Sequence, residues 1–355
     1  MFLTPQHILF ATLFFSVFMI TLLVFIIIAL IVKNKREKNQ IIWEPKIDIL
    51  ITESIFFDDE ESKEFYIPIN KKITALLKKT FFRKTLIHQL VLSARNISGT
   101  SANNLGLLYL QLGLAKDSLA NLKNSLWHKK AKAIQELATM QQLEFSPRLY
   151  KLINHKNEYI RMEAQISMIK FHGFDGLDFL DEITYPLSEW HQINILKELA
   201  FLAAANFKGI GNWLKSKNDS VIVFALKLCA TYHQFDLYDK IADCLEHTNP
   251  KVRLQAIRCL KEIYVDTTAR QLIRIYQSQP KIHQLAILKA LQEIAAPESL
   301  SFLENQLFSD DNQIKLEAAR ALYKCGLEGE ILLNSHPEAN LYPLNEIIQQ
   351  IKMEI

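Results

Sequence analysis

The chain has 355 residues, of which 49% are hydrophobic and 22% are charged, and its formal net charge is +3. Its 9 glycines and 10 prolines fall well below the usual shares of ~7% and ~5%. Folds that need glycine at turns and phosphate loops, such as β-sandwiches and dinucleotide-binding sheets, are therefore disfavoured. The apolar content excludes disorder for most of the chain, and 4 cysteines are too few for a disulfide scaffold.

The first predicted element runs from Ile8 to Val32, where 25 consecutive positions are uncharged and 22 of them are hydrophobic. At 1.5 Å per residue a helix of this length extends about 37 Å, enough to cross a ~30 Å hydrocarbon core with some tilt. A cleaved signal would have a basic start, a core of roughly 7–15 residues and a small-residue cleavage site. The sequence has none of these features. We therefore predict a retained transmembrane helix over residues 8–32.

Basic residues follow the predicted span directly and none precedes it. The positive-inside rule then predicts that residues 1–7 form a short extracytoplasmic N-terminus and that the rest of the chain is cytoplasmic. The cysteines agree with a reducing compartment, because they have no C-x-x-C spacing and lie within helical patterns. We expect a single-pass protein of the cell (inner) membrane. The candidate membrane-surface residues beside the span are Lys33, Lys35, Arg36 and Lys38.

Opposed blocks of charge come next. Residues 33–63 are predicted to be a charged juxtamembrane linker, and their run Asp58 to Glu61 is interpreted as a solvated turn. Residues 64–95 then combine basic residues with apolar residues at helical spacing, which predicts a basic amphipathic helix. This helix either lies against anionic headgroups or presents a solvated face while packing on the repeats. Its candidate membrane-surface residues are Lys71, Lys72, Lys78, Lys79, Arg83 and Lys84.

From residue 127 onward the sequence repeats with a period of about 31 residues. One column of small or β-branched residues recurs at steps of 31, 31, 30, 31, 31 and 31. Apolar residues follow each member by four positions, and a second column, which is apolar except for two histidines, precedes it by four: Ile160, His191, Val221, Val252, His283 and Ile314. That spacing places them on one helix face. A second apolar set and a polar turn complete each unit, so residues 127–330 are predicted to form about seven stacked helical hairpins. The column is Ala133, Ala164, Ile195, Ala225, Ala256, Ile287 and Ala318.

Caps are expected at both ends of the repeats. Residues 64–126 are predicted to form an N-terminal cap, which includes the basic helix and one hairpin over about 102–126. The run Asn104 to Tyr109 with Gly113 resembles the first helix of a tetratricopeptide repeat. Residues 331–355 are predicted to form the C-terminal cap, closed by a final helix from Leu344 to Met353.

The helix starts Asn249-Pro250-Lys251-Val252-Arg253-Leu254-Gln255-Ala256 and Glu158-Tyr159-Ile160-Arg161-Met162-Glu163-Ala164 resemble those of HEAT repeats. They are most similar to the short bacterial variety named after the phycobilisome lyases. The resemblance implies an all-α fold, here one transmembrane helix followed by an α-solenoid, as in membrane-anchored bacterial HEAT-repeat proteins. In the family, Asp or Asn and Arg form a ladder between repeats. Because Arg occupies that position only at Arg161 and Arg253, we expect an incomplete ladder.

No sequence motif for chemistry occurs in the chain: there is no G-x-x-x-x-G-K-[ST], H-E-x-x-H, G-x-S-x-G or paired-cysteine zinc pattern. We therefore expect no catalytic residue, no cofactor, no metal and no small-molecule substrate. The repeat region is almost neutral, which disfavours nucleic acid as a partner because phosphate binding needs a basic stripe.

The leading functional hypothesis is a non-catalytic membrane-tethered scaffold that binds a protein partner at the inner face of the membrane. Aromatic residues dominate protein interfaces, and several fall near predicted hairpin ends, above all in the long turn from Tyr185 to Trp190. Two alternatives stay open: a lyase or isomerase activity, implied only by the family resemblance, and nucleic-acid binding by the repeats. The candidate interface residues are Trp127, Tyr185, Trp190, Trp213 and Tyr232.

Overall fold

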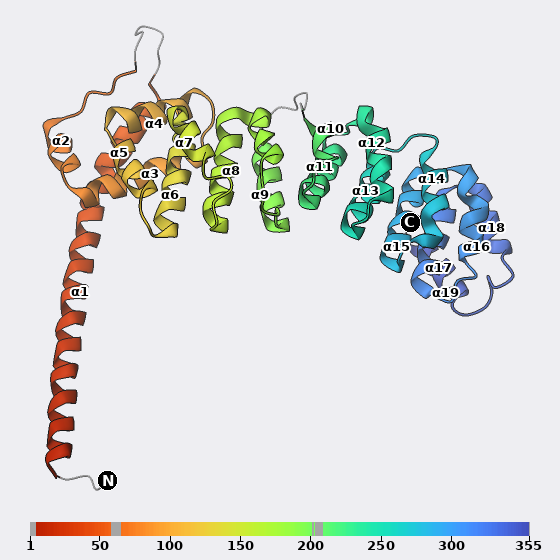
Figure 1. Cartoon of the computed structure of the whole chain (residues 1–355), viewed down its shortest axis with the longest axis horizontal. Helices are drawn as coiled ribbons and strands as arrows, with labels where there is room; N and C mark the ends of the chain where they lie inside the picture. Colours follow the sequence, from red (N-terminus) through yellow and green to blue (C-terminus); the bar gives the residue numbers. More distant parts are fainter. Residues whose placement is uncertain (1–4, 58–64, 201, 203–208, 355) are drawn as a thin grey trace. The chain divides into compact units, whose positions relative to one another are not determined.

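The computed structural model describes residues 5–57, 65–200, 202 and 209–354 (Figure 1). Within these ranges the chain is helical and contains no strand, so the predicted all-α class is confirmed. The run Asp58 to Glu61, expected to be a solvated turn, lies outside the described residues. The chain divides into two compact units, which we call unit 1 (Met1–Phe171) and unit 2 (His172–Ile355).

Unit 1 begins with α1 (Pro5–Ile55), a single helix of 51 residues. From Leu9 to Val32 its large apolar side chains are 42–73% exposed, and this part extends away from the other helices of unit 1 (Figure 1). From Trp43 on, one face of the same helix is buried. The segment 33–63, expected to be a linker, is thus helical as far as Ile55 and contributes to the core.

The physical reason is an apolar face within the acidic block. Trp43, Ile47, Leu50 and Ile51 follow one another at spacings of four, three and one, which places them on one side of a helix. All four are at most 7% exposed. The acidic residues between them point elsewhere on the helix, so charge and core coexist in the same segment.

The predicted basic helix is divided in two at Lys78 and Lys79, because Lys79 has an extended backbone and forms the N-cap of the second helix. Asn70 caps the first helix by accepting hydrogen bonds from the backbone N–H groups of Lys72 and Ile73. The remaining helices of unit 1 are α2 (Lys71–Leu77), α3 (Thr80–Arg95), α4 (Thr100–Gln111), α5 (Ala115–Leu122), α6 (Trp127–Thr139), the 3₁₀ helix η1 (Leu143–Phe145), α7 (Ser146–Tyr150) and α8 (Glu158–His172).

The α4–α5 hairpin lies where the tetratricopeptide-like hairpin was expected. Gly106 of α4 allows a close approach, since a Cβ there would lie 2.6 Å from the backbone oxygen of Met140. Three buried groups then join α4, α5 and α6: the Tyr109 hydroxyl donates to Ser118 Oγ at 2.8 Å, and Ser118 donates to the Glu136 carboxylate. Burial raises the pKa of Glu136.

The first helices of the repeats follow the predicted period. They begin at residues 127, 158, 189, 219, 250, 281 and 312, and every member of the repeating column from Ala133 to Ala318 is 0% exposed. In unit 2 these helices are α9 (Glu189–Leu199), α11 (Asp219–Thr231), α13 (Pro250–Glu262), α15 (Lys281–Ile294) and α17 (Asn312–Lys324). Neighbours from α11 to α17 pack side by side, as repeats that cannot bury their apolar faces alone must do.

The second elements of the repeats in unit 2 are shorter and partly 3₁₀. The final helix, α19, has the bounds expected from the sequence, Leu344–Met353, and packs against α17. The second elements are η2 (Gly173–Asp181), α10 (Ile210–Trp213), η3 (Phe235–Leu237), α12 (Tyr238–Asp243), η4 (Cys244–Glu246), α14 (Thr268–Ile275), η5 (Tyr276–Ser278), η6 (Pro297–Ser299), α16 (Leu300–Gln306) and α18 (Leu327–Ser335).

Candidate interaction surfaces

The α2–α3 corner packs against α1 just after the apolar part of that helix. The Phe81 ring lies 5.5 Å from the Arg36 guanidinium and 5.5 Å from the Trp43 ring. Trp43 also meets Phe82 edge to face at 5.3 Å. These aromatic and cation–π contacts fix the corner beside the helix.

This packing joins two basic segments that are far apart in the sequence. Lys78 and Lys79 at the corner are exposed, as are the four cations that follow the apolar part of α1. Lys71, Lys72 and Lys84 are exposed on α2 and α3. We call the surface beside α1 the basic collar; it consists of Lys33, Lys35, Arg36, Lys38, Lys78 and Lys79.

Arg83 is a correction to the set of membrane-surface candidates. Its guanidinium donates to both carboxylate oxygens of Asp117, at 2.8 and 3.0 Å, and to the Leu77 carbonyl at 2.8 Å. This paired carboxylate raises the pKa of Arg83. Arg83 is therefore a half-buried link between the α2–α3 corner and α5, because a bidentate partner from 34 residues away uses its donors.

Trp213 is a second correction, because it is 1% exposed and cannot serve as an interface anchor. It ends the four-residue helix α10 and packs beneath Gly209, where a Cβ would lie 3.1 Å from the indole ring. Trp213 is a core residue of unit 2.

In unit 1 two exposed aromatic side chains form a stacked pair. Trp127, the first residue of α6, is 46% exposed, and its ring stacks on Tyr159 of α8 at 4.8 Å. Tyr159 is 55% exposed and was not among the sequence candidates. The sequence could have identified Tyr159 by its position, because it is the second residue of its repeat helix, as Trp190 is.

In unit 2 one exposed aromatic surface lies on α9. Trp190 is 66% exposed, and Ile193, three residues later on the same helix, is 55% exposed. The turn before them is held in place, since Asn218 donates to the Tyr185 carbonyl at 3.2 Å and Leu187 N–H donates to Ser220 at 2.8 Å. The Tyr185 side chain is 39% exposed. Trp190 and Ile193 thus form an exposed apolar pair on a fixed support.

The remaining aromatic candidate, Tyr232, is half-buried. Its ring meets Phe174 edge to face at 5.5 Å, and burial raises its pKa. Tyr232 therefore contributes more to packing within unit 2 than to its surface.

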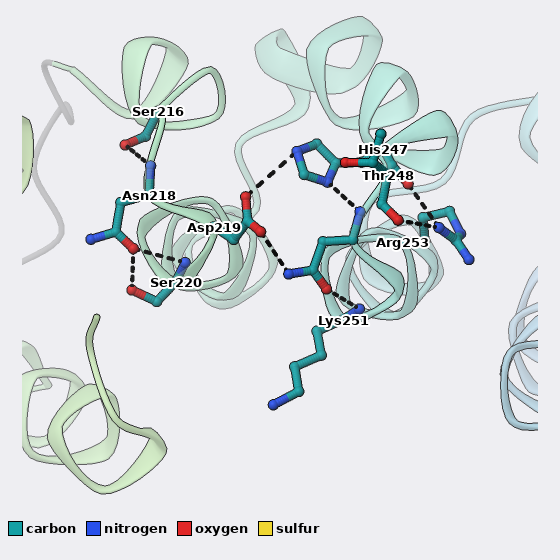
Figure 2. Close-up of polar contacts among 9 residues, drawn as sticks. Ser216, Asn218, Asp219, Ser220, His247, Thr248, Lys251 and Arg253 are labelled. Atoms are coloured by element: carbon teal, nitrogen blue, oxygen red, sulfur yellow. Dashed lines mark hydrogen bonds and ion pairs between the residues drawn. The ribbon is translucent and has the colours of Figure 1, made fainter. Parts of the chain in front are cut away.

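The turns between repeats carry a polar ladder, shown for α11 and α13 in Figure 2. Asn249 caps α13 by accepting from Lys251 N–H at 2.9 Å and donates to the Asp219 carboxylate at 2.6 Å. His247 lies 3.8 Å from the same carboxylate. The start of one repeat helix is therefore bonded to the turn of the next, which fixes the register between the two repeats.

The arginine position of this ladder is filled more completely than the sequence suggested. Arg253 donates to the carbonyls of His247 and Thr248 at 2.8 and 3.0 Å, and Arg161 makes the equivalent bonds in its own turn. At the same repeat position Gln192 donates to Leu187 and Gln284 to Tyr276. Glutamine therefore substitutes for arginine as a donor to the carbonyls that precede the repeat helix, in the turn for Gln192 and in η5 for Gln284.

A charged cavity of about 410 Å³ lies where α13, α15, α17 and α19 meet. Arg320 pairs there with Glu317 at 3.6 Å and with Glu354 at 2.8 Å, and Lys289 pairs with Glu317 at 3.5 Å. Cations and carboxylates are thus both present, with the cations in excess. The lining residues are Lys261, Lys289, Gln292, Glu293, Glu317, Arg320, Tyr323, Lys324, Ile351 and Glu354.

The cysteines are poor nucleophiles at neutral pH. Burial raises the pKa of Cys229 to about 12 and that of Cys244 to about 11, so both remain thiols. Across residues 5–57, 65–200, 202 and 209–354, no three His, Cys, Asp or Glu side chains are grouped so that they could hold a metal ion.

Comparison with known proteins gives resemblances of fold at low identity. No protein-family model and no curated protein matches the chain. An engineered protein of known structure is 16% identical at a TM-score of 0.37, covering 79% of this chain and 88% of its own. The complex of CpcE and CpcF of phycocyanin lyase from Nostoc sp. PCC7120 is 13% identical at 0.27, covering 83% and 99%. A designed armadillo repeat protein is 14% identical at 0.23, covering 72% and 99%. The chain is a helical-repeat protein, as its own helices and their period show.

Proposed function

We propose that this chain is a membrane-anchored adaptor that holds a helical-repeat module at the cytoplasmic face of the inner membrane and binds a protein there. The observation that carries the proposal is the continuity of α1. From Thr12 on, this helix is long and apolar enough to cross a membrane, and its last three turns belong to the core of unit 1. A rigid helix therefore couples the anchor to the first unit.

The position of the basic collar supports this arrangement. Arg36 follows Val32 by four residues, which is about 6 Å along the helix. The polar headgroup layer on each side of the hydrocarbon core is roughly 5–8 Å thick. If the span ends at Val32, the α2–α3 corner lies at the level of the headgroups. Each basic residue near an anionic surface contributes about 1 kcal/mol to membrane binding.

The exposed aromatic pairs support binding of a protein. Trp190 with Ile193 in unit 2 and Trp127 with Tyr159 in unit 1 present large apolar area that folding leaves uncovered. Tryptophan and tyrosine are the residues that anchor protein interfaces most often. An anchor in the membrane also raises the local concentration of partners in the same membrane.

Membrane insertion is tested by alkaline extraction of bacterial membranes that contain the full chain. We expect the protein to stay in the pellet. A variant with a flexible Gly-Ser linker after Lys38 should also stay there, because its anchor is intact. In vesicles with anionic lipid, however, Lys78 and Lys79 should be protected from an amine-reactive reagent in the native chain and lose that protection in the linker variant. Release at alkaline pH would refute the anchor.

Partner binding is tested in intact cells by photo-crosslinking from an apolar photoreactive residue that replaces Ile193, which is exposed on the same helix as Trp190. We expect crosslinked proteins that disappear with Trp190→Ala and persist with Phe235→Ala, a matched control because Phe235 is also exposed, at 53%. Identical crosslinked sets for the two variants would exclude the α9 surface as the interface.

A further inference from the structure

A column of cations runs along the first helices of four successive repeats in unit 2. Lys227, Arg258, Lys289 and Arg320 occupy the same position in α11, α13, α15 and α17, separated by 31 residues each time. Because equivalent helices pack side by side, equivalent positions form a row across them. We call these four residues the basic column.

The charges of the basic column are only partly neutralised. Arg258 has no hydrogen bond or ion pair with any residue that the structure describes. The single carboxylate of Glu317 lies between Lys289 at 3.5 Å and Arg320 at 3.6 Å. Burial, opposed by Glu189 and reinforced by Arg258, lowers the pKa of Lys227. Lys227 and Arg258 therefore repel each other, whereas Lys289 and Arg320 share one carboxylate.

One end of the column already binds a carboxylate. Arg320 Nη2 donates to both oxygens of Glu354, at 2.8 and 3.1 Å, and Gln350 donates to the same carboxylate at 2.7 Å. The Nε atom of Arg320 is buried and has no hydrogen-bond partner among the described residues. The 410 Å³ cavity continues from this pair past Lys289 towards Lys261 and α13. Glu354 thus shows how a carboxylate is held there.

We propose that the basic column docks an extended acidic segment of a protein partner, with one carboxylate for each repeat. Packed helices lie about 8–10 Å apart, and three residues of an extended chain in the polyproline II conformation make one turn of about 9 Å, which returns every third side chain to the same face. A segment with an acidic residue at every third position therefore matches the column, and Glu354 competes with it for Arg320. The proposal deepens the adaptor function by giving the chemistry of the partner, and its test does not depend on membrane insertion.

The test measures binding of a fluorescent peptide of sixteen residues, with Glu at every third position and Ala or Ser between, to the full chain in neutral detergent. We expect saturable binding that weakens about three- to five-fold with Lys289→Ala or Arg258→Ala, as partly exposed charge pairs do. The double variant should weaken it ten-fold or more. Arg270→Ala on α14, which removes an exposed cation outside the column, should leave binding unchanged.

A further variant, Glu354→Ala, distinguishes docking on the basic column from general attraction of the peptide to positive charge, because the two predict different changes in peptide affinity. Glu354→Ala frees Arg320 and should tighten peptide binding two-fold or more, whereas general attraction to a positive surface would respond as weakly as it does to Glu328→Ala. A peptide of the same composition with its acids clustered should bind at least five-fold more weakly. Equal binding of the two peptides would overturn the proposal. Tighter binding of duplex DNA than of the peptide would overturn it in favour of nucleic acid.

If the column variants lose their fold, circular dichroism and the melting temperature report it. Lys289→Gln and Arg258→Gln, which keep the aliphatic stems, then replace the alanine variants. Unchanged peptide binding in these folded variants would also overturn the proposal.

Discussion

Units 1 and 2 use the same helical hairpins but are held together differently. Unit 1 is built around α1, and its core joins residues as distant as Trp43, Phe82 and Tyr109 in one cluster. In unit 2 the repeat helices from α11 to α17 contact their neighbours, and turns are bonded from one repeat to the next, as Asn249 is to Asp219. The part of unit 1 that packs on α1 is therefore a cooperative cap, and unit 2 is a linear array.

This difference has consequences for how each unit responds to change. In a linear array stability is a sum of repeat and interface terms, so damage to one repeat is felt locally. In the cap, a change at α1 affects every helix that packs on it. Hydrogen exchange of the full chain in detergent resolves the two units, because protection is measured segment by segment.

The largest expected effect is a local loss of stability in unit 2. Trp213→Ala should destabilise its repeat by about 3–5 kcal/mol, because it empties a buried space of indole size. Exchange should rise from α10 to α11 and stay unchanged in unit 1. Trp190→Ala is the matched control, because Trp190 is exposed, and it should change the free energy of unfolding by less than about 0.5 kcal/mol. Equal effects of the two variants would contradict the burial of Trp213.

Substituting one glycine in each unit compares how much space the neighbouring residues leave for a side chain. Gly106→Ala should cost about 1–3 kcal/mol in unit 1, because its Cβ would meet the rigid backbone oxygen of Met140 at 2.6 Å. Gly211→Ala in unit 2 should be neutral or stabilising, since its nearest contact is the flexible end of Lys240 at 2.8 Å. Melting temperatures of the two variants give the check. A tolerated Gly106→Ala would show that α4 and α6 are not in close contact.

A smaller effect is expected where the ladder joins two repeats. Asn249→Ala removes the cap of α13 and the hydrogen bond to Asp219, which together should cost about 1–2 kcal/mol. Exchange should rise at the start of α13. Lys251→Ala, an exposed neighbour whose backbone alone is bonded, serves as the control. An unchanged Asn249→Ala variant would mean that packing alone sets the register.

The smallest effect is a pH dependence in unit 1. Because burial raises the pKa of Glu136 above its ordinary 4.5, the folded state binds a proton more tightly than the unfolded state. The stability that this group contributes is therefore lost as the pH rises from about 4.5 through the raised pKa of Glu136. Glu136→Gln should raise the melting temperature slightly at pH 7 and leave it unchanged at pH 4. A lower melting temperature at pH 7 would show that the charge is stabilising.

The repeats were predictable from the sequence because their signal is periodic. Each start from Trp127 to Asn312 follows from the column that includes Ala133 and Ala318, since one period fixes helix, turn and buried face together. The final helix was likewise predictable, because Pro343 precedes its apolar run.

The cap and the surfaces were less predictable, because they depend on contacts between distant residues. Composition indicates that residues 44–62 are acidic, and only the partners of Trp43 reveal that they also enter a core. Trp213 and Trp190 were both candidate interface residues; Trp213 lies on the second element of its repeat and is buried, whereas Trp190 lies at the start of a first helix and is exposed. Arg83 shares its basic block with Lys79, and Asp117 alone distinguishes them.

The depth of single spin labels in anionic vesicles tests the central claim, that α1 couples a membrane span rigidly to unit 1. Labels are placed at Val24, Lys79 and Thr100, with half-buried Cys325 replaced by Ser and the other cysteines buried. Thr100 is exposed and precedes Ser101, which bonds to the Ile55 carbonyl at the far end of α1 from the span. We predict a label at Val24 deep in the hydrocarbon, one at Lys79 at headgroup depth and one at Thr100 in water. Equal exposure of the Lys79 and Thr100 labels to an aqueous relaxant would contradict the coupling, and a water-exposed label at Val24 would contradict the span itself.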